Sequence, residues 1–472
     1  MLVHNYTFLP EEMNYGYQKD LFYVRSEKKS SVVELADSSD TKESSLTESQ
    51  KEALQIMLKE KNVFLTGAAG TGKSFLLREF IKTMDENKCV VLGPTGVAAM
   101  KIGGSTIHRF FRLPLGIINR LILSEESKKN TWARFMNAAK NLSCVKALII
   151  DEISMCRCDV FDHIASIVQY VRKKYNPDLK LILCGDFYQL PPVICGREKT
   201  TFSKLYADNL DGWAFKSNMW KKLNIKKIFL SEVIRQKDRD FSHALTCIRN
   251  GDSSGISFIN AFRPKNKSYK NQIIICGKNN TADNINSKFL NKIQGDSFSC
   301  DVIKEGDVNK SEITCAEHLD FKVGARVLFI ANDISSNYFN GDTGTIKSVN
   351  RETIYIINDR TGRLVTVKPY TWYVYDYKPS ETEKNKLEKV IVGSYTQLPI
   401  RLGWAITVHK SQGQTYDNVW IEHSDFWSFG QLYVALSRST NLDKTFMSCD
   451  ISYKNFNTSY DVQLFYQEYE FL

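Results

Sequence analysis

The chain has 472 residues, too many for a single hydrophobic core, which predicts roughly two to four domains. Its hydrophobic content of 43% and charged content of 25% are ordinary for a globular protein, and no long uncharged apolar run predicts a membrane span. The net charge of +10 makes a polyanion a candidate partner without identifying one. Eleven cysteines, mostly within apolar runs, indicate a reducing, intracellular compartment.

The N-terminal residues 1–45 are expected to form an arm and a flexible linker. Scattered aromatic residues occupy positions 1–24, whereas Ser, Lys, Glu and Asp dominate positions 26–45. The early acidic residues are unlike those of a transit peptide. A helix is predicted from Thr47, where Gln50 can close a capping box or offer its amide to an adenine edge. The local pattern alone favours the cap.

A glycine-rich stretch after the apolar residues 63–66 is the strongest motif of the chain. It reads GAAGTGKS, fits G-x-x-x-x-G-K-[ST], and is followed by a helical pattern. Its glycines let backbone N–H groups close around phosphate oxygens at a helix N-terminus. Lys73 can then reach the β- and γ-phosphates of ATP, and the Ser74 hydroxyl can bind Mg²⁺. The other predicted ligands are Gly67, Ala68, Ala69, Gly70, Thr71 and Gly72.

Further apolar strands are predicted at residues 89–92, 145–150 and 181–184. Strand, helix and strand in this order predict a parallel, doubly wound α/β sheet with its ligand crevice at the carboxyl ends of the strands. The strand at 145–150 ends in Asp151, which suits Mg²⁺, and Glu152, which can orient or deprotonate water. Gln189 follows the next strand and can sense a γ-phosphate without competing for Mg²⁺.

The segment Arg109–Arg112 interleaves arginine with phenylalanine, a composition that can stack bases and hold phosphates. A loop-and-core interpretation is nearly as well supported and stays open. Residues 105–143 predict a small helical or wedge insertion. Residues 322–375 alternate strand-like runs with glycine turns, which predicts a small SH3-like β-barrel. Two isolated arginines, Arg235 and Arg438, are surface charges unless they reach a γ-phosphate from a second lobe.

The ordered set of motifs resembles the Pif-family helicases, in the RecD-like branch of superfamily-one DNA helicases. The matching segments are GAAGTGKS, GPTGVAA with GGSTIH, DEISM, GDFYQLPPV, VIRQKDRDF, NGDTGTI, WAITVHKSQGQT and YVALSRS. They follow the family order and cover most of the chain, and GDFYQLPPV and VHKSQGQT are highly specific. The match after His108 is loose, which leaves the strand-separating wedge unassigned, and residues 448–472 show no family pattern.

The resemblance implies ATP and Mg²⁺ in a cleft between two RecA-like, doubly wound parallel-sheet lobes, with single-stranded DNA across their top. It favours the adenine role for Gln50. The residues implied to be catalytic are Lys73, Asp151, Glu152, Gln189, Arg235 and Arg438, with Ser74 and Asp151 on the metal and Gly413 also near the nucleotide. The residues implied to contact DNA are Pro94, Thr95, Gly96, His108, Thr407, His409 and Lys410.

The implied domains are a first lobe at residues 46–222, a second lobe at 223–300 and 396–472 that ends in a C-terminal tail, and the β-barrel at 301–395. The implied activity is that of an ATP-dependent DNA helicase that moves 5′ to 3′ on single-stranded DNA and opens tailed duplexes, in replication, repair, recombination or telomere maintenance. An RNA helicase and an ATP-switched nucleic-acid clamp are the alternatives. We expect a monomer in the nucleus or at a viral replication site, with single-strand-binding or replisome proteins as partners and no membrane.

Overall fold

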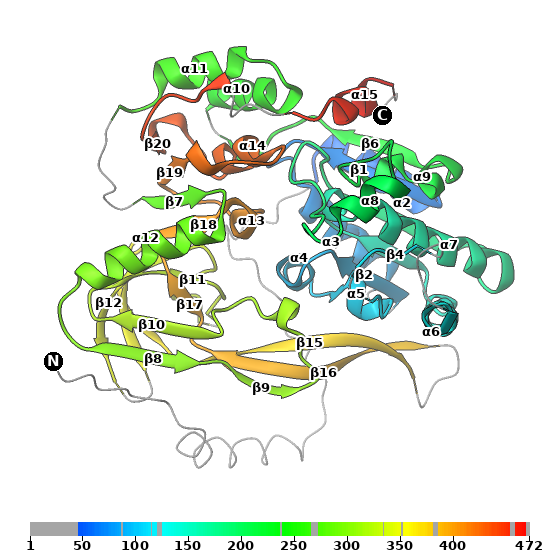
Figure 1. Cartoon of the computed structure of the whole chain (residues 1–472), viewed down its shortest axis with the longest axis horizontal. Coiled ribbons are helices and arrows are strands. Elements are labelled where there is room, and N and C mark those ends of the chain that lie inside the picture. The colour runs from blue at the N-terminus through cyan, green and yellow to red at the C-terminus, as the bar shows by residue number, and fades with distance from the viewer. Residues whose placement is uncertain are drawn as a thin grey trace.

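The computed structural model describes residues 46–85, 88–114, 116–119, 125–236, 238–265, 272–333, 335–350, 353–380, 386–453 and 458–468. The arm and linker predicted at residues 1–45 lie outside the described residues. Two α/β lobes stand side by side, and a β-rich insertion extends beneath both (Figure 1). Within the described ranges, none of the helices combines the length and the apolar character that a membrane crossing needs.

Lobe 1 is built on a six-stranded sheet in the order β3-β2-β4-β5-β1-β6, and every pairing in it is parallel. The strands are β1 Asn62–Gly67, β2 Cys89–Gly93, β3 Ser105–Thr106, β4 Ala147–Ile150, β5 Lys180–Cys184 and β6 Lys226–Leu230. Alternate side chains of β1 enter different cores, because Phe64 packs on one face while Val63 and Leu65 pack on the other. The sheet is therefore buried on both faces, as helix-covered parallel strands require.

The helices of lobe 1 cover both faces of this sheet (Figure 1). They are α2 Glu48–Lys59, α3 Lys73–Met84, α4 Gly96–Lys101, α5 Ile107–Phe110, α6 Glu125–Leu142, α7 Cys158–Lys174, α8 Lys199–Leu205 and α9 Asn218–Lys222. The first of them begins at a capping box in which Thr47 and Gln50 satisfy each other's backbone N–H groups.

Two predicted boundaries of lobe 1 need correction. The division at residue 222 assigned Lys226–Leu230 to the second lobe, but β6 pairs with β1 and buries Ile228 and Leu230 in the lobe 1 core. The insertion predicted from residue 105 begins later, because Ser105–Thr106 pairs with β2 in the main sheet. Both errors arise because edge strands are short and carry little periodicity of their own.

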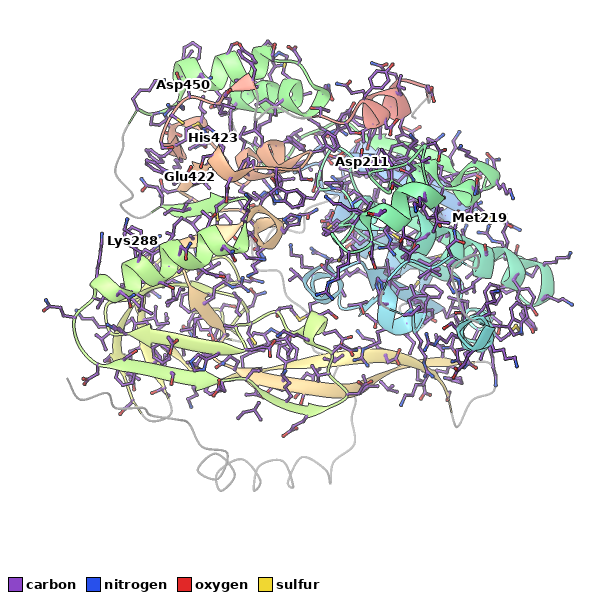
Figure 2. The ribbon with its side chains drawn as sticks, viewed as in Figure 1. Asp211, Met219, Lys288, Glu422, His423 and Asp450 are labelled. Carbon is purple, nitrogen blue, oxygen red and sulfur yellow. The ribbon has the colours of Figure 1, made fainter. Side chains whose placement is uncertain are left out.

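Lobe 2 has a four-stranded parallel sheet in the order β18-β7-β19-β20. Its strands are β7 Ile273–Cys276, β18 Ala405–Thr407, β19 Val419–Glu422 and β20 Thr445–Met447, and its helices are α10 Arg239–Asn250, α11 Ser254–Phe262, α12 Asn279–Lys292, α13 Val408–Ser411 and α14 Gln431–Leu436. Glu422 and His423 lie where β19 ends, and Lys288 lies on α12 (Figure 2).

The last helix, α15 Tyr460–Glu468, leaves lobe 2 and returns to lobe 1 (Figure 1). Its Val462 and Phe465 are buried in the lobe 1 core. The C-terminal tail predicted to follow the second lobe therefore packs on lobe 1 through α15. No sequence motif marks this helix, and its assignment depends on apolar contacts with residues far away in the chain.

The insertion consists of antiparallel strands: a five-stranded sheet β14-β13-β12-β11-β17, a three-stranded sheet β15-β16-β9 and a pair β10-β8. The strands are β8 Ser297–Asp301, β9 Ile303–Gly306, β10 His318–Lys322, β11 Arg326–Phe329, β12 Thr343–Val349, β13 Ile354–Asn358, β14 Leu364–Val367, β15 Tyr370–Pro379, β16 Leu387–Gln397 and β17 Ile400–Leu402. They extend beyond both ends of the predicted range 301–395. The predicted fold class, two parallel-sheet lobes with an antiparallel insertion, is confirmed.

The insertion docks on lobe 1 at the segment whose function the sequence left open. Arg109 is buried and donates to both Glu312 and Asp307 of the insertion. Phe110 and Phe111 are buried in the lobe 1 core. The nucleic-acid interpretation of these three residues is therefore wrong, because their aromatic rings and charge are already engaged within the protein.

Candidate active site

The glycine-rich segment forms a backbone cradle between β1 and α3. Gly70 and Gly72 have φ values of 87° and 82°, in the left-handed region that favours glycine. A side chain at Gly70 would also collide, since its Cβ would lie 2.5 Å from the Cβ of Arg235. Lys73 Nζ donates to Gly67 O at 2.8 Å and Ala68 O at 2.9 Å, and desolvation lowers the pKa of Lys73. The cradle and its cation fit a phosphate chain.

Gln50 takes the capping role, and its amide also contacts the cradle. Its Oε1 accepts from Thr47 N at 3.2 Å, which completes the cap, and its Nε2 donates to Thr71 O at 3.4 Å, which joins it to the cradle. The side chain is buried beside Gly72. The cap thus fixes the amide at the nucleotide site, and the adenine contact stays a prediction.

Two carboxylates lie at the end of β4 beside the cradle. Asp151 Oδ1 accepts from Glu152 N at 2.9 Å, and Glu152 itself has a left-handed backbone with φ 53°, a strained conformation for a residue with a Cβ. Desolvation raises the pKa of Asp151, and desolvation together with Asp151 raises the pKa of Glu152 to about 6. A hydroxyl and a carboxylate are oxygen ligands that suit Mg²⁺, and Ser74 and Asp151 would hold it here.

A glutamine of lobe 2, Gln412, closes the cleft and was missed by the sequence analysis. Its Nε2 donates to Glu152 Oε2 at 3.1 Å and to Gln189 Oε1 at 3.2 Å. Lys101 Nζ of lobe 1 donates to the Gln412 carbonyl. The residue lies within the motif VHKSQGQT, so the motif contained the signal, but only the folded chain shows that it joins two lobe 1 residues.

The predicted γ-phosphate arginines border the same cleft. Arg438 is 1% exposed, and its guanidinium donates to the carbonyls of Val434, Ser411 and Gln414 and to Ser437 Oγ. Desolvation and the nearby Arg235 lower the pKa of Arg438 to about 9.

Arg235 is half-buried, and its backbone N–H donates to Gly70 O at 3.3 Å. Among the described residues, no carboxylate lies within ion-pair distance of Arg438; its guanidinium bonds to carbonyls and a hydroxyl, and Glu152 acts on it only at longer range. A buried cation without an ion-pair partner, beside a phosphate cradle, is suited to an anion.

The residues predicted to contact DNA fall into two groups. His108 and Lys410 are exposed, and the half-buried His409 lies nearly parallel to the exposed ring of Trp427, 6.3 Å away. In contrast, Thr95 accepts from Ala98 N and caps α4. The first group is accessible to a nucleic-acid strand, while Thr95 serves the local fold.

The other members of this set lie close to protein neighbours. Thr407 is buried and caps α13, Pro94 is half-buried, and Gly96 is buried against the carbonyl of Ser311 in the insertion. Gly413, predicted near the nucleotide, is exposed, and a Cβ there would collide with Lys101 Nζ. DNA and nucleotide contacts by these residues stay predictions.

Two parallel α/β lobes, with a phosphate cradle and carboxylates on one and the buried Arg438 on the other, define a two-lobed P-loop motor. The sequence matches the PIF1-like helicase family over residues 45–256 and the UvrD-like helicase C-terminal domain over residues 402–442. It is 35% identical over 413 residues to ATP-dependent DNA helicase Pif1 of Campylobacter jejuni, covering 82% of this chain and 89% of that protein. The chain therefore belongs to the PIF1-like helicase family, as its motifs predicted.

Relatives and solved structures extend this likeness. ATP-dependent DNA helicase PIF1 of Homo sapiens is 30% identical over 414 residues, which are 84% of this chain and 60% of that protein. The crystal structure of Bacteroides sp Pif1 in complex with ADP-AlF4 has a TM-score of 0.77 at 32% identity, covering 90% of this chain and 96% of that one. Bacteroides Pif1 bound to ssDNA has a TM-score of 0.62 at 31% identity, covering 90% and 97%.

Proposed function

We propose that this chain is an ATP-dependent DNA helicase that uses Mg²⁺ and ATP to move along single-stranded DNA and open duplexes. The observation that carries the proposal is the cleft itself, where Gln412 of lobe 2 bonds to Glu152 and Gln189 of lobe 1. A site assembled from two lobes can convert hydrolysis into relative motion of those lobes. The names of the relatives, ATP-dependent DNA helicases, support the same activity.

The chemistry assigned to each residue follows from its place in the cleft. Lys73 binds the β- and γ-phosphates, and Glu152, whose pKa is raised, accepts the proton of the attacking water. Gln189 and Gln412 orient that water, because the amide of Gln412 bonds both to Glu152 and to the amide of Gln189. When bound, Mg²⁺ neutralises charge on the phosphates. The two arginines, Arg235 and Arg438, stabilise the charge that develops in the transition state.

The DNA track is proposed to cross both lobes over the exposed His108 and Lys410 and the half-buried His409. The direction is proposed to be 5′ to 3′, because GDFYQLPPV and the β insertion before WAITVHKSQGQT resemble the RecD-like branch. We further propose a monomer that acts where the genome is copied, in the nucleus or at a viral replication site, with single-strand-binding or replisome proteins.

One set of substrates tests the proposal. ATPase rates are measured alone, with single-stranded DNA and with RNA of the same sequence, and unwinding is measured on duplexes with a 5′ tail, a 3′ tail or blunt ends. We expect DNA to stimulate hydrolysis and only the 5′-tailed duplex to open. Stimulation by RNA alone would indicate an RNA helicase, and stimulation without unwinding would indicate an ATP-switched clamp.

A further inference from the structure

The C-terminal helix α15 is anchored to both lobes, although its sequence carries no family motif. Phe465 packs against Phe215 of lobe 1, with ring centroids 4.4 Å apart. Lys216 of lobe 1 forms an ion pair with Asp461 at 2.8 Å. On its other side, Gln463 Nε2 donates to Asn250 O of α10 in lobe 2 at 3.1 Å. The helix therefore lies across the junction of the two lobes (Figure 1).

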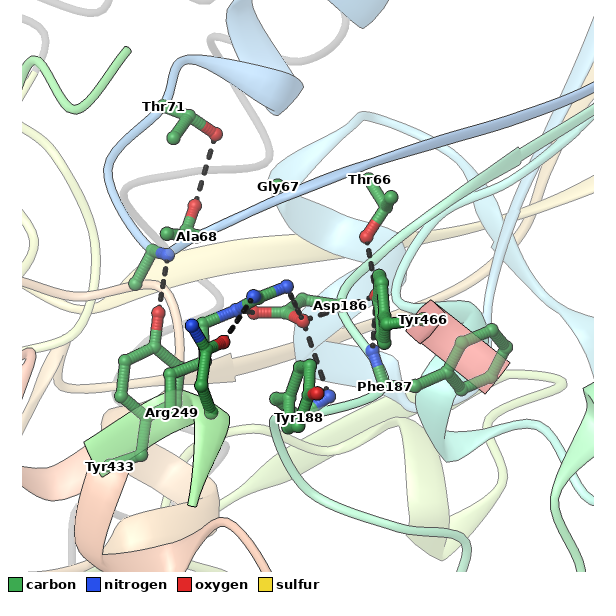
Figure 3. A network of polar contacts seen from close by, with 12 residues as sticks. Thr66, Gly67, Ala68, Thr71, Asp186, Phe187, Tyr188, Arg249, Tyr433 and Tyr466 are labelled. Carbon is green, nitrogen blue, oxygen red and sulfur yellow. Dashed lines mark hydrogen bonds and ion pairs between the residues drawn. The ribbon is translucent and has the colours of Figure 1, made fainter. Parts of the chain in front are cut away.

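One side chain of α15, Tyr466, reaches the two segments that carry the nucleotide site (Figure 3). Its hydroxyl lies 2.7 Å from Oγ1 of Thr66, the residue immediately before Gly67 of the cradle. The same hydroxyl donates to Asp186 Oδ1 at 3.3 Å and accepts from Phe187 N at 3.3 Å, in the loop after β5. A single hydroxyl thus joins the end of β1 to the loop that leads to Gln189.

A buried ion pair extends this network into lobe 2. Arg249 of α10 donates to both oxygens of Asp186, at 2.9 and 3.1 Å. The guanidinium lies 4.4 Å above the ring of Tyr188 and 5.1 Å above that of Tyr466, and these two rings stack 4.8 Å apart. Asp186 is fully buried and attracts the charge of Lys73. Its orientation therefore depends on these partners.

The cradle is held by tyrosine hydroxyls at two points. Ala69 N donates to the hydroxyl of Tyr433, from lobe 2, at 2.7 Å. Thr66, three residues earlier, contacts Tyr466 of α15. The first contact depends on how lobe 2 approaches, whereas the second holds β1 against its own lobe (Figure 3). The position of Lys73 relative to Gln189 is therefore set in part by a residue outside the motif segments quoted above.

We propose that Tyr466 is a positioning residue for ATP hydrolysis, which holds the end of β1 and the Asp186–Gln189 loop at the separation that hydrolysis requires. This inference rests on the ATPase function proposed above. Because ATP touches the cradle and not α15, loss of the hydroxyl alters alignment more than affinity. The turnover number should therefore fall while KM for ATP stays nearly constant.

The test uses the full chain and two substitutions that remove one hydroxyl each, Tyr466→Phe and Thr66→Val. A hydrogen bond to a charged group contributes about 1.5–3 kcal/mol, so Tyr466→Phe should lose roughly tenfold or more in kcat. KM for ATP should change by less than about twofold. The double variant should be no slower than the slower single variant, because the two hydroxyls act as a pair. Tyr460→Phe, on the exposed start of the same helix, should match the wild type.

A second variant separates positioning from simple support of the fold. Phe465→Leu weakens the packing of α15 and keeps the hydroxyl, so it should lower the melting temperature and leave kcat nearly unchanged in the folded protein. The inference would be overturned if Tyr466→Phe kept the wild-type kcat. It would also be overturned if the two losses of kcat multiplied in the double variant, or if Phe465→Leu lost as much kcat as Tyr466→Phe. An inactive wild type would instead refute the ATPase function itself.

Discussion

Two buried arginines, one at the docking surface of the insertion and one in the nucleotide cleft, have opposite electrostatic surroundings. Arg109 is 8% exposed and Arg438 is 1% exposed, so burial alone does not distinguish them. Arg109 donates to Glu312 Oε2 at 2.6 Å and Asp307 Oδ2 at 2.8 Å, and these carboxylates raise its pKa above the ordinary value. Arg438 has only carbonyl and hydroxyl acceptors, and its pKa is lowered to about 9.

The difference separates an arginine that joins two domains from one that is available to a ligand. A buried charge is costly unless it is paired, so a protein retains an unpaired one mainly where a substrate supplies the counter-charge. Arg109 has its counter-charge within the chain, whereas Arg438 lies beside a phosphate cradle. We therefore expect substitutions at the docking surface to change stability and substitutions in the cleft to change catalysis.

The largest effect is expected at the cation inside the cradle itself. Lys73→Ala should abolish ATP hydrolysis and leave binding of single-stranded DNA largely intact, because Lys73 contacts the cradle and is not among the residues predicted to contact DNA. ATPase assays and fluorescence anisotropy on one preparation measure both properties. Lys82→Ala, which removes an exposed lysine of the same helix that pairs with Glu79, is the matched control. Turnover retained by Lys73→Ala would contradict the P-loop assignment.

The second effect tests the cleft arginine directly. Arg438→Ala should retain nucleotide binding and lose a factor of roughly 10³–10⁵ in turnover, as expected for an arginine that acts on transition-state charge. Arg438→Lys should remain impaired, because a lysine lacks the planar fork that holds Ser411 and Gln414 together. Hydrolysis by Arg438→Ala within about threefold of wild type, less than ~1 kcal/mol of barrier, would exclude this role.

The third effect tests the other half of the comparison, at the docking surface. Arg109→Met leaves Glu312 buried without its partner and should lower the free energy of unfolding by about 3–5 kcal/mol. Chemical denaturation followed by tryptophan fluorescence measures this loss, and the DNA-independent ATPase of the folded variant should stay near wild type.

The exposed pair of Lys265 and Asp450 provides the control for Arg109, since Lys265→Met should cost less than ~1 kcal/mol. Adding Glu312→Gln to Arg109→Met should recover part of the stability by removing the stranded charge. An Arg109→Met variant that is as stable as wild type but hydrolyses ATP slowly would reverse the comparison.

The contrast also shows which parts of the molecule the sequence could predict. The backbone form of the cradle could be predicted because it depends on glycine conformation and on neighbours close in the chain. The apolar run at 63–66 likewise forms the strand β1, Asn62–Gly67, because a strand buried on both faces has a continuous apolar sequence. Local chemistry was sufficient for these features.

Features that depend on distant partners were not predictable in the same way. Arg109 pairs with carboxylates 198 and 203 positions later in the chain. The composition of the segment around it matched a nucleic-acid contact, but these distant partners give Arg109 a structural role. Gln412 and Tyr466 reach the site only after folding, 260 and 400 positions from Glu152 and Thr66. The family resemblance identified the cleft, but the side chains that align it required the structure.

The smallest effect is expected at Gln236, a neutral side chain that is buried without a hydrogen-bond partner in the described part of the chain. It is buried, and neither its Oε1 nor its Nε2 has a hydrogen-bond partner among the described residues. Its Oε1 lies 3.0 Å from the place a Cβ on Gly70 would occupy, so the amide faces the cradle. An unpartnered buried amide costs about 1–3 kcal/mol, and a nucleotide in the cradle can remove that cost.

Gln236→Met, which keeps the length and removes the amide, should therefore stabilise the free protein and weaken ATP binding by roughly five- to a hundredfold. Thermal unfolding without nucleotide and equilibrium binding of ATP measure the two changes, with the exposed Gln55→Met of α2 as control. Stability and affinity that fall together would show that the amide serves the fold, and Gln236 would then resemble Arg109 more than Arg438.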